Sequence, residues 1–166
     1  MSIAQSLLPE FDHEFATLRK FLARVPDDRM GYTPHAKSMP MGQLSGHLTE
    51  LPGWVNATIE GDELDFATFD YKPFVPATAA EAVAALDAAL AKARPVLERT
   101  SDADMMKPWT LRKGETVYFT MPKVAVLRSF VMNHMIHHRA QLGVYLRLND
   151  VALPGTYGPS ADEGNM

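Results

Sequence analysis

Residues 121–148, MPKVAVLRSFVMNHMIHHRAQLGVYLRL, carry a strong helical periodicity. Apolar and imidazole side chains recur there at alternating steps of three and four, which places them on one stripe of an α-helix, the stripe that a helical bundle buries. The members of this stripe are Val124, Leu127, Val131, His134, His138, Gln141, Tyr145 and Leu148. Two histidines and a glutamine thus occupy the middle of a predicted core face. Because an unpaired imidazole in an apolar core costs free energy, these side chains are expected to share a partner.

Three further segments carry helical periodicity. The four expected helices span residues 2–25, 38–59, 78–100 and 120–148, and the second begins at either Ser38 or Pro40. Ser2 and Gln5 have the spacing of a capping box at the first helix start, and Thr78 begins a second capping box with Glu81. Pro52 lies inside the second segment, removes one backbone donor and should kink that helix. Four amphipathic helices that cover one another's apolar faces predict an all-α fold, a four-helix bundle.

The segments between the expected helices differ in character. Residues 61–77 are acidic and aromatic, and are expected to form a long crossover whose aromatic side chains pack against the bundle. Residues 109–112 and 116–120 flank a Lys-Gly-Glu turn, which indicates a small hairpin before the last helix. The tail after Asn149 contains several Pro and Gly residues and is expected to be an ordered loop or an extended arm.

Composition and charge narrow the class of protein. The chain has 166 residues, the usual size of one domain, so residues 1–166 are expected to form a single domain. A net charge of −4 and the lack of any dense Lys/Arg run argue against nucleic acid or a membrane as a partner. The N-terminus does not resemble a signal peptide, so a soluble cytoplasmic protein is expected. There is no cysteine, so a bound metal would need nitrogen and oxygen ligands.

The histidines have the spacing of a metal site. His134 and His138 lie one helical turn apart on one face, and His47 occupies the equivalent place in the stripe of the second helix. Three nitrogen ligands with an open fourth position are typical of a catalytic metal site, where the ion activates water or polarises a substrate. Met135 stands where a zincin metalloprotease would carry its glutamate, which excludes that hydrolase. Neutral imidazoles suit zinc, nickel, copper or iron about equally well.

Several neighbours leave alternatives open. His137 could replace His138 as a ligand or face an adjacent helix. Gln141 could donate a hydrogen bond to a metal-bound ligand or bond a neighbouring helix. Glu50 lies one turn from His47 and is either a partner that orients an imidazole or, more simply, a solvated surface carboxylate. His13 is expected at the surface.

Trp54 and Tyr145 are large rings near the centre of the predicted site. Packing in the core is expected of both, in preference to a role as a platform for substrate.

Two stretches of the sequence resemble the DinB-like (DinB/YfiT) superfamily of metal-dependent enzymes. They are SMPMGQLSGHLTELPGW at residues 38–54 and NHMIHHRAQLGVYLRLNDVALPGTYGPSADE at residues 133–163. The resemblance implies a four-helix bundle, often homodimeric, with a divalent metal ion held by three histidines. It carries over to His47, His134 and His138, with zinc or nickel as the usual ion. Ala140 stands where the family commonly has glycine, a departure that leaves the ligands intact.

The family includes transferases and an isomerase that use a low-molecular-weight thiol cofactor. The leading hypothesis is therefore a metal-dependent enzyme that acts on a small molecule, either by thiol transfer, which the resemblance favours, or by hydrolysis. The alternative is a non-catalytic metal-binding or stress-response dimer, its site closed by Glu50, Gln141 or His13. A third hypothesis is a metal-free bundle whose histidines only form hydrogen bonds.

Overall fold

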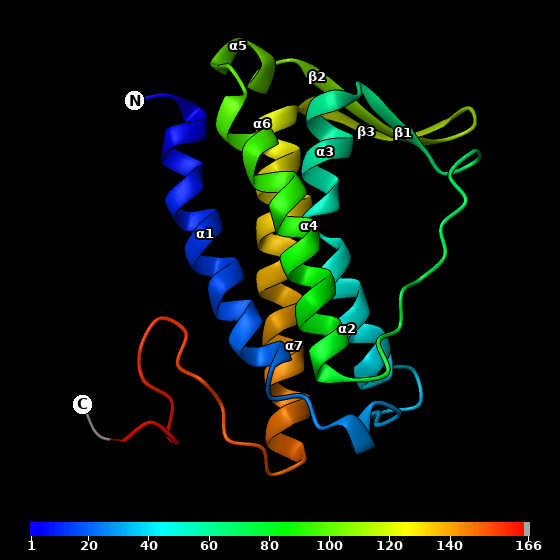
Figure 1. Cartoon of the computed structure of the whole chain (residues 1–166). Coiled ribbons are helices and arrows are strands. Elements are labelled where there is room, and N and C mark those ends of the chain that lie inside the picture. Colours follow the sequence, from blue (N-terminus) through cyan, green and yellow to red (C-terminus); the bar gives the residue numbers. More distant parts are fainter. Residues whose placement is uncertain (165–166) are drawn as a thin grey trace.

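The computed structural model of the chain describes residues 1–164 and consists of a helical bundle with a small sheet at one end (Figure 1). The last two residues of the predicted domain lie outside the described residues. The long helices are α1 (Ile3–Leu22), α2 (Met41–Glu50), α3 (Gly53–Glu60), α4 (Ala79–Arg99) and α7 (His134–Leu148). Shorter helical pieces are η1 (Asp27–Arg29), α5 (Asp102–Met105), α6 (Lys123–Val126) and the π-helix η2 (Leu127–Asn133).

Two of the expected helix starts are confirmed. The Ser2 hydroxyl accepts a hydrogen bond from the Gln5 backbone amide, and the Gln5 side chain accepts one from the Ser2 amide, which completes the capping box of α1. At α4 the Thr78 hydroxyl accepts from the amide of Glu81, whose carboxylate accepts from Ala77. These bonds satisfy amides that have no partner within the helix.

The second expected helix is divided in two. α2 ends at Glu50 and α3 begins at Gly53, so the predicted interruption at Pro52 is confirmed, although Leu51 and Pro52 keep right-handed helical backbone angles. Pro52 has no amide hydrogen to donate to the preceding turn, and its ring crowds that turn. The break lies one turn past His47 and redirects the chain along the same side of the bundle.

The all-α fold class is wrong, because three strands form a mixed sheet. β2 (Pro108–Lys113) and β3 (Thr116–Pro122) are the predicted hairpin, turning at Gly114, whose φ of 58° lies in the left-handed region. β1 (Glu63–Asp65) adds to the other edge of β2 in the parallel direction, so the crossover supplies a strand. A three-residue strand is too short to show the two-residue alternation of a sequence pattern, and its pairing partner lies far along the chain.

The last helix also departs from the expected register. A π-helical turn holds one residue more than an α-helical turn, so η2 shifts the core face by one position. After Leu127 the most deeply buried side chains are Val131, Met132, Met135, Leu142 and Leu146, each at most 1% exposed, and Tyr145 is 8% exposed. Of the predicted stripe beyond η2, only Tyr145 therefore lies in the core. His134 and His138 lie half-buried at the edge of the core, and Leu148 is 57% exposed.

The sheet packs on the end of the bundle through its own apolar cluster. Trp109, Leu111 and Val126 are its buried centre, with Trp54, Leu64 and Phe130 packed around them. The buried Lys123 donates from Nζ to the carbonyls of Ile59 (3.1 Å) and Gly61 (2.7 Å), at the C-terminal end of α3. A cation at that end is favourable because the last carbonyls of a helix carry partial negative charge.

The crossover and the tail run outside the bundle. After β1 the chain follows the outer side of α3 and α2 to the opposite end of the bundle, where α4 begins (Figure 1). Through Gly164 the tail is a loop, as expected, and Arg147 binds the Asp162 carboxylate through two hydrogen bonds. That pairing, with the Leu153 amide, lowers the pKa of Asp162 to about 2. Among the described residues, no helix has both the length and the apolar character needed to span a membrane.

Candidate metal centre

Three imidazole nitrogens meet between α2 and α7. The Nε2 atom of His134, the first residue of α7, lies 3.2 Å from Nε2 of His47 and 2.9 Å from Nε2 of His138. One ligand atom from each ring lies within 4.8 Å of the other two. Nitrogens bound to one zinc ion at about 2.0–2.1 Å with tetrahedral angles lie about 3.3 Å apart. The three predicted side chains are thus brought together at a spacing that fits a single ion.

The hydrogen bonds around the cluster leave too few protons between these nitrogens. The Gln141 carbonyl oxygen can only accept, so His138 donates to it from Nδ1 at 2.6 Å. A neutral His138 therefore presents a lone pair at Nε2. Nε2 of His134 faces nitrogens on two sides and can supply at most one proton to both contacts. Opposed lone pairs at these distances repel each other, and a cation between them removes the repulsion.

Burial keeps the three rings neutral near pH 7. It lowers the pKa of His134 to about 4, and the neighbouring His138 and His47 reinforce this effect. The pKa of His47 is lowered mainly by burial and then by His138. Burial also lowers the pKa of His138, although its bond to Gln141 opposes the shift. Neutral imidazole is the form that binds a metal ion, so the donor set fits a divalent transition metal.

Gln141 is placed as a partner of the histidines and not of a neighbouring helix. While its carbonyl accepts from His138, its amide nitrogen donates to Nε2 of His137 at 3.1 Å. This chain of bonds fixes the ring of His138, the role that outer partners of metal ligands commonly have.

The remaining candidates lie outside the cluster. His137 packs edge-on against His138 with a centroid distance of 4.9 Å and is tied to Gln141. His13 is exposed on α1, as expected. Among the described residues, no aspartate or glutamate completes a group with the three histidines. A metal ion bound by the three histidines would therefore take its remaining ligands from something other than the aspartates and glutamates of the described residues.

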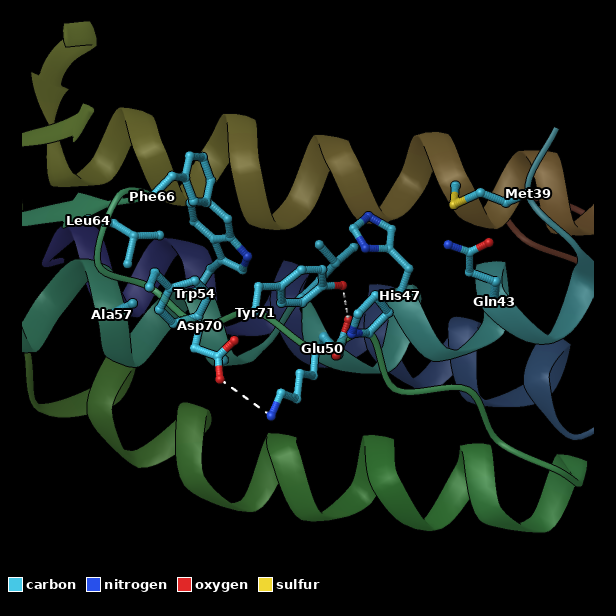
Figure 2. Close-up of a pocket in the computed structure, with 15 residues that line it drawn as sticks. Met39, Gln43, His47, Glu50, Trp54, Ala57, Leu64, Phe66, Asp70 and Tyr71 are labelled. Carbon is cyan, nitrogen blue, oxygen red and sulfur yellow. Dashed lines mark hydrogen bonds and ion pairs between the residues drawn. The ribbon is translucent and has the colours of Figure 1, made fainter. Parts of the chain in front are cut away.

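His47 also lines a cavity of about 770 Å³ beside the cluster. The cavity lies between α2, α3 and the crossover, and the side chains around it are shown in Figure 2. Trp54, Ala57, Leu64 and Phe66 gather at one end, with His47, Glu50 and Tyr71 near the middle. Trp54 was expected in the core, but it is only half-buried and forms part of the cavity wall. Tyr145 does lie in the core, and its hydroxyl donates to the Met39 carbonyl.

Glu50 has a role that the sequence did not reveal. Its carboxylate accepts from the Tyr71 hydroxyl at 2.6 Å and from the Phe74 amide at 3.1 Å, so it ties the crossover to α2. Burial, followed by the bond to Glu50, raises the pKa of Tyr71 to about 12. Glu50 is half-buried, and no hydrogen bond joins it to His47 among the described residues.

Gly46 permits the same attachment of the crossover. A Cβ atom at this position would lie 1.8 Å from the Phe74 carbonyl oxygen, far inside van der Waals contact. Only the aromatic character of residues 61–77 hinted that this segment closes over a surface.

Comparisons with known proteins agree with this architecture. A DinB-like protein of Bacillus cereus ATCC 10987 has a similar solved structure, with a TM-score of 0.73, 20% identity, and coverage of 94% of this chain and 98% of that chain. A DinB-like protein of Bacillus subtilis gives a TM-score of 0.71 and 18% identity, with 91% and 97% covered. A comparison with curated proteins finds no match. The sequence profile of the DinB family matches residues 1–165, and the chain therefore belongs to the DinB family.

Proposed function

We propose that His47, His134 and His138 bind one divalent transition-metal ion and that the protein is a metal-dependent enzyme acting on a small molecule. The observation that carries this proposal is the convergence of three Nε2 atoms with too few protons between them. The cavity supports a catalytic role over a purely structural one, because His47 lines it and a small molecule bound there would lie beside the cluster.

The chain's own residues have separate tasks in this proposal. The three histidines hold the ion, and Gln141 orients the ring of His138 through its carbonyl oxygen. The crossover, tied down by Glu50, forms one wall of the cavity. A bound divalent ion supplies a Lewis acid that lowers the pKa of a water molecule or a thiol.

The choice between thiol transfer and hydrolysis depends on family membership. Thiol-dependent transfer remains the favoured reaction type on that ground, with zinc or nickel as the proposed ion. Imidazole donors alone suit either ion, and copper or iron as well.

Metal analysis of matched variants tests the ligand set. Protein purified without a histidine tag should contain one ion per chain, and the His137→Ala variant should retain it. The His138→Ala variant should lose more than about a hundredfold in affinity, because loss of even an outer partner of a ligand costs about 10–100-fold. Stoichiometric metal in His138→Ala, or loss of metal in His137→Ala, would refute the assignment.

The homodimer is a second proposal and follows from the family alone. Val144 and Leu148 lie one turn apart on α7, and each is 57% exposed, which leaves apolar surface available to a second copy. Analytical ultracentrifugation of the full chain would measure the oligomeric state directly.

A further inference from the structure

The cavity beside His47 differs in chemistry along its length. From these differences we infer that the substrate of the metal site is an uncharged molecule with an aromatic ring, its reactive end at His47 and its ring beside Trp54. The placement of the ligand's reactive end rests on the proposed function, whereas the placement of its aromatic ring rests on the cavity alone.

The apolar end is built from aromatic and aliphatic side chains of separate elements. Trp54 of α3 stacks on Phe130 with a centroid distance of 6.0 Å and an interplanar angle of 19°, which fixes the orientation of the indole. Leu64 of β1 and Phe66 face the same space (Figure 2). The small side chain of Ala57 leaves room between them. Rings of this kind bind another aromatic ring by stacking or by edge-to-face contact.

The distance from the reactive end to the apolar end sets the size of the ligand. Trp54 follows His47 by seven residues, which corresponds to about 10 Å along a helix. A bicyclic ring bearing one polar substituent spans that distance. A cavity of about 770 Å³ is within the range of small-molecule sites.

The charged groups that line the cavity are already paired. Both oxygens of Glu50 accept hydrogen bonds from the crossover. Lys72 and Asp70 form an ion pair at 3.4 Å, and their side chains are 85% and 83% exposed. Gln43, at the far end, is uncharged.

The one cation among the lining side chains, Lys72, thus lies in solvent, and an anionic substituent in the cavity would find no buried cation there. Desolvating an unpaired charge is costly, so the cavity favours an uncharged ligand. A thiol that carries several carboxylates would leave these charges unpaired at the apolar end.

Calorimetric titration with a matched pair of ligands tests the inference. 2-Naphthamide and 2-naphthoate share one ring system and differ in charge. The full-length protein, both as purified and with chelator present, should bind the amide at least about tenfold more tightly than the carboxylate, because the carboxylate is desolvated without a partner. Equal binding, or tighter binding of 2-naphthoate with chelator present, would overturn the inference.

A matched pair of variants places the ring within the cavity. Ala57→Glu adds a charge at the apolar end and should weaken 2-naphthamide binding at least about tenfold. Ala88→Glu makes the same change on an exposed position of α4 and should leave the affinity unchanged. Full affinity in Ala57→Glu would place the ring elsewhere and overturn the inference.

A spectroscopic measurement on the unmodified chain covers the case in which Ala57→Glu fails to fold. The chain has two tryptophans, of which Trp54 lines the cavity and Trp109 is fully buried. On addition of 2-naphthamide, the indole N–H resonance of Trp54 should shift more than that of Trp109, with a Trp54→Phe variant for assignment. A larger shift at Trp109 would overturn the inference.

Metal analysis of the same samples separates the two proposals. Binding of 2-naphthamide by protein that never holds an ion would refute the metal-dependent function and leave the cavity's preference standing. A metal-loaded protein that does not bind 2-naphthamide would refute the inference about the cavity and leave the proposed metal site standing.

Discussion

The histidine cluster and the aromatic end of the cavity beside it originate in different ways. The cluster comes from α2 and α7, where His134 and His138 are one turn apart and a periodic pattern reveals them. The aromatic end combines α3, the short strand β1 and an irregular crossover. Reactive groups on regular helices can be identified from local spacing, whereas the shape of the space beside them depends on contacts between distant segments.

The largest effect is expected where the crossover meets α2. In Gly46→Ala the new Cβ would collide with the Phe74 carbonyl oxygen, so the crossover must move. We expect a loss of about 3 kcal/mol in the free energy of unfolding, measured by chemical denaturation, because a backbone atom cannot yield as a flexible side chain can.

Gly53→Ala is the matched control for this variant. No atom lies within 4 Å of a Cβ at Gly53, so this variant should be as stable as the wild type or slightly more stable. If Gly46→Ala were as stable as Gly53→Ala, the crossover would not be held against α2 as described.

An intermediate effect is expected at the histidine cluster. Gln141→Leu removes the acceptor that holds Nδ1 of His138, and the affinity for Zn²⁺ or Ni²⁺ should fall about 10–100-fold in a competition titration with a chelator. The melting temperature of the chelator-treated variant should match that of chelator-treated wild type. An unchanged metal affinity would show that Gln141 does not position the ligand.

The smallest effect is expected at Glu50, which ties the crossover to α2. Glu50→Gln keeps the shape of the side chain but removes its charge, and a hydrogen bond to a charged group is worth about 1 kcal/mol more than a neutral one. Exchange of the Phe74 amide hydrogen should accelerate correspondingly. The pKa of Tyr71 should fall below about 12, because the anion that opposes its ionisation is gone.

Glu60→Gln serves as the control for this variant, since Glu60 pairs with Arg99 at the surface, away from the crossover. If Glu50→Gln and Glu60→Gln changed the Phe74 exchange rate equally, Glu50 would not be the anchor of the crossover.

The sequence predicted the long helices and the hairpin because their signals are local. Capping boxes, the break at Pro52 and the turn at Gly114 each depend on neighbouring residues. It failed for β1, whose three residues pair with residues far along the chain. It also failed for most of the core face of α7, where only Tyr145 of the predicted stripe is buried, since an ideal helical period cannot anticipate the extra residue of a π-helical turn.

The same difference between local and long-range signals applies to the candidate site. The histidine pair of α7 and the histidine of α2 were identified from their spacing, and the structure brings their nitrogens together. The tasks of Glu50 and Gly46 were not identified, because each acts on a segment more than twenty residues away. A carboxylate and a glycine inside a helix do not by themselves indicate which distant segment they contact.

The sequence by itself determined which residues are the candidate metal ligands, because the helical repeat places their side chains on defined faces. Tertiary structure decided how far those faces turn toward the core, and which segment closes the cavity beside them. The physical reason is the distance along the chain over which each interaction acts. Helical periodicity and caps arise within a few residues, whereas the register of packing and the shape of a cavity are set by the whole chain at once.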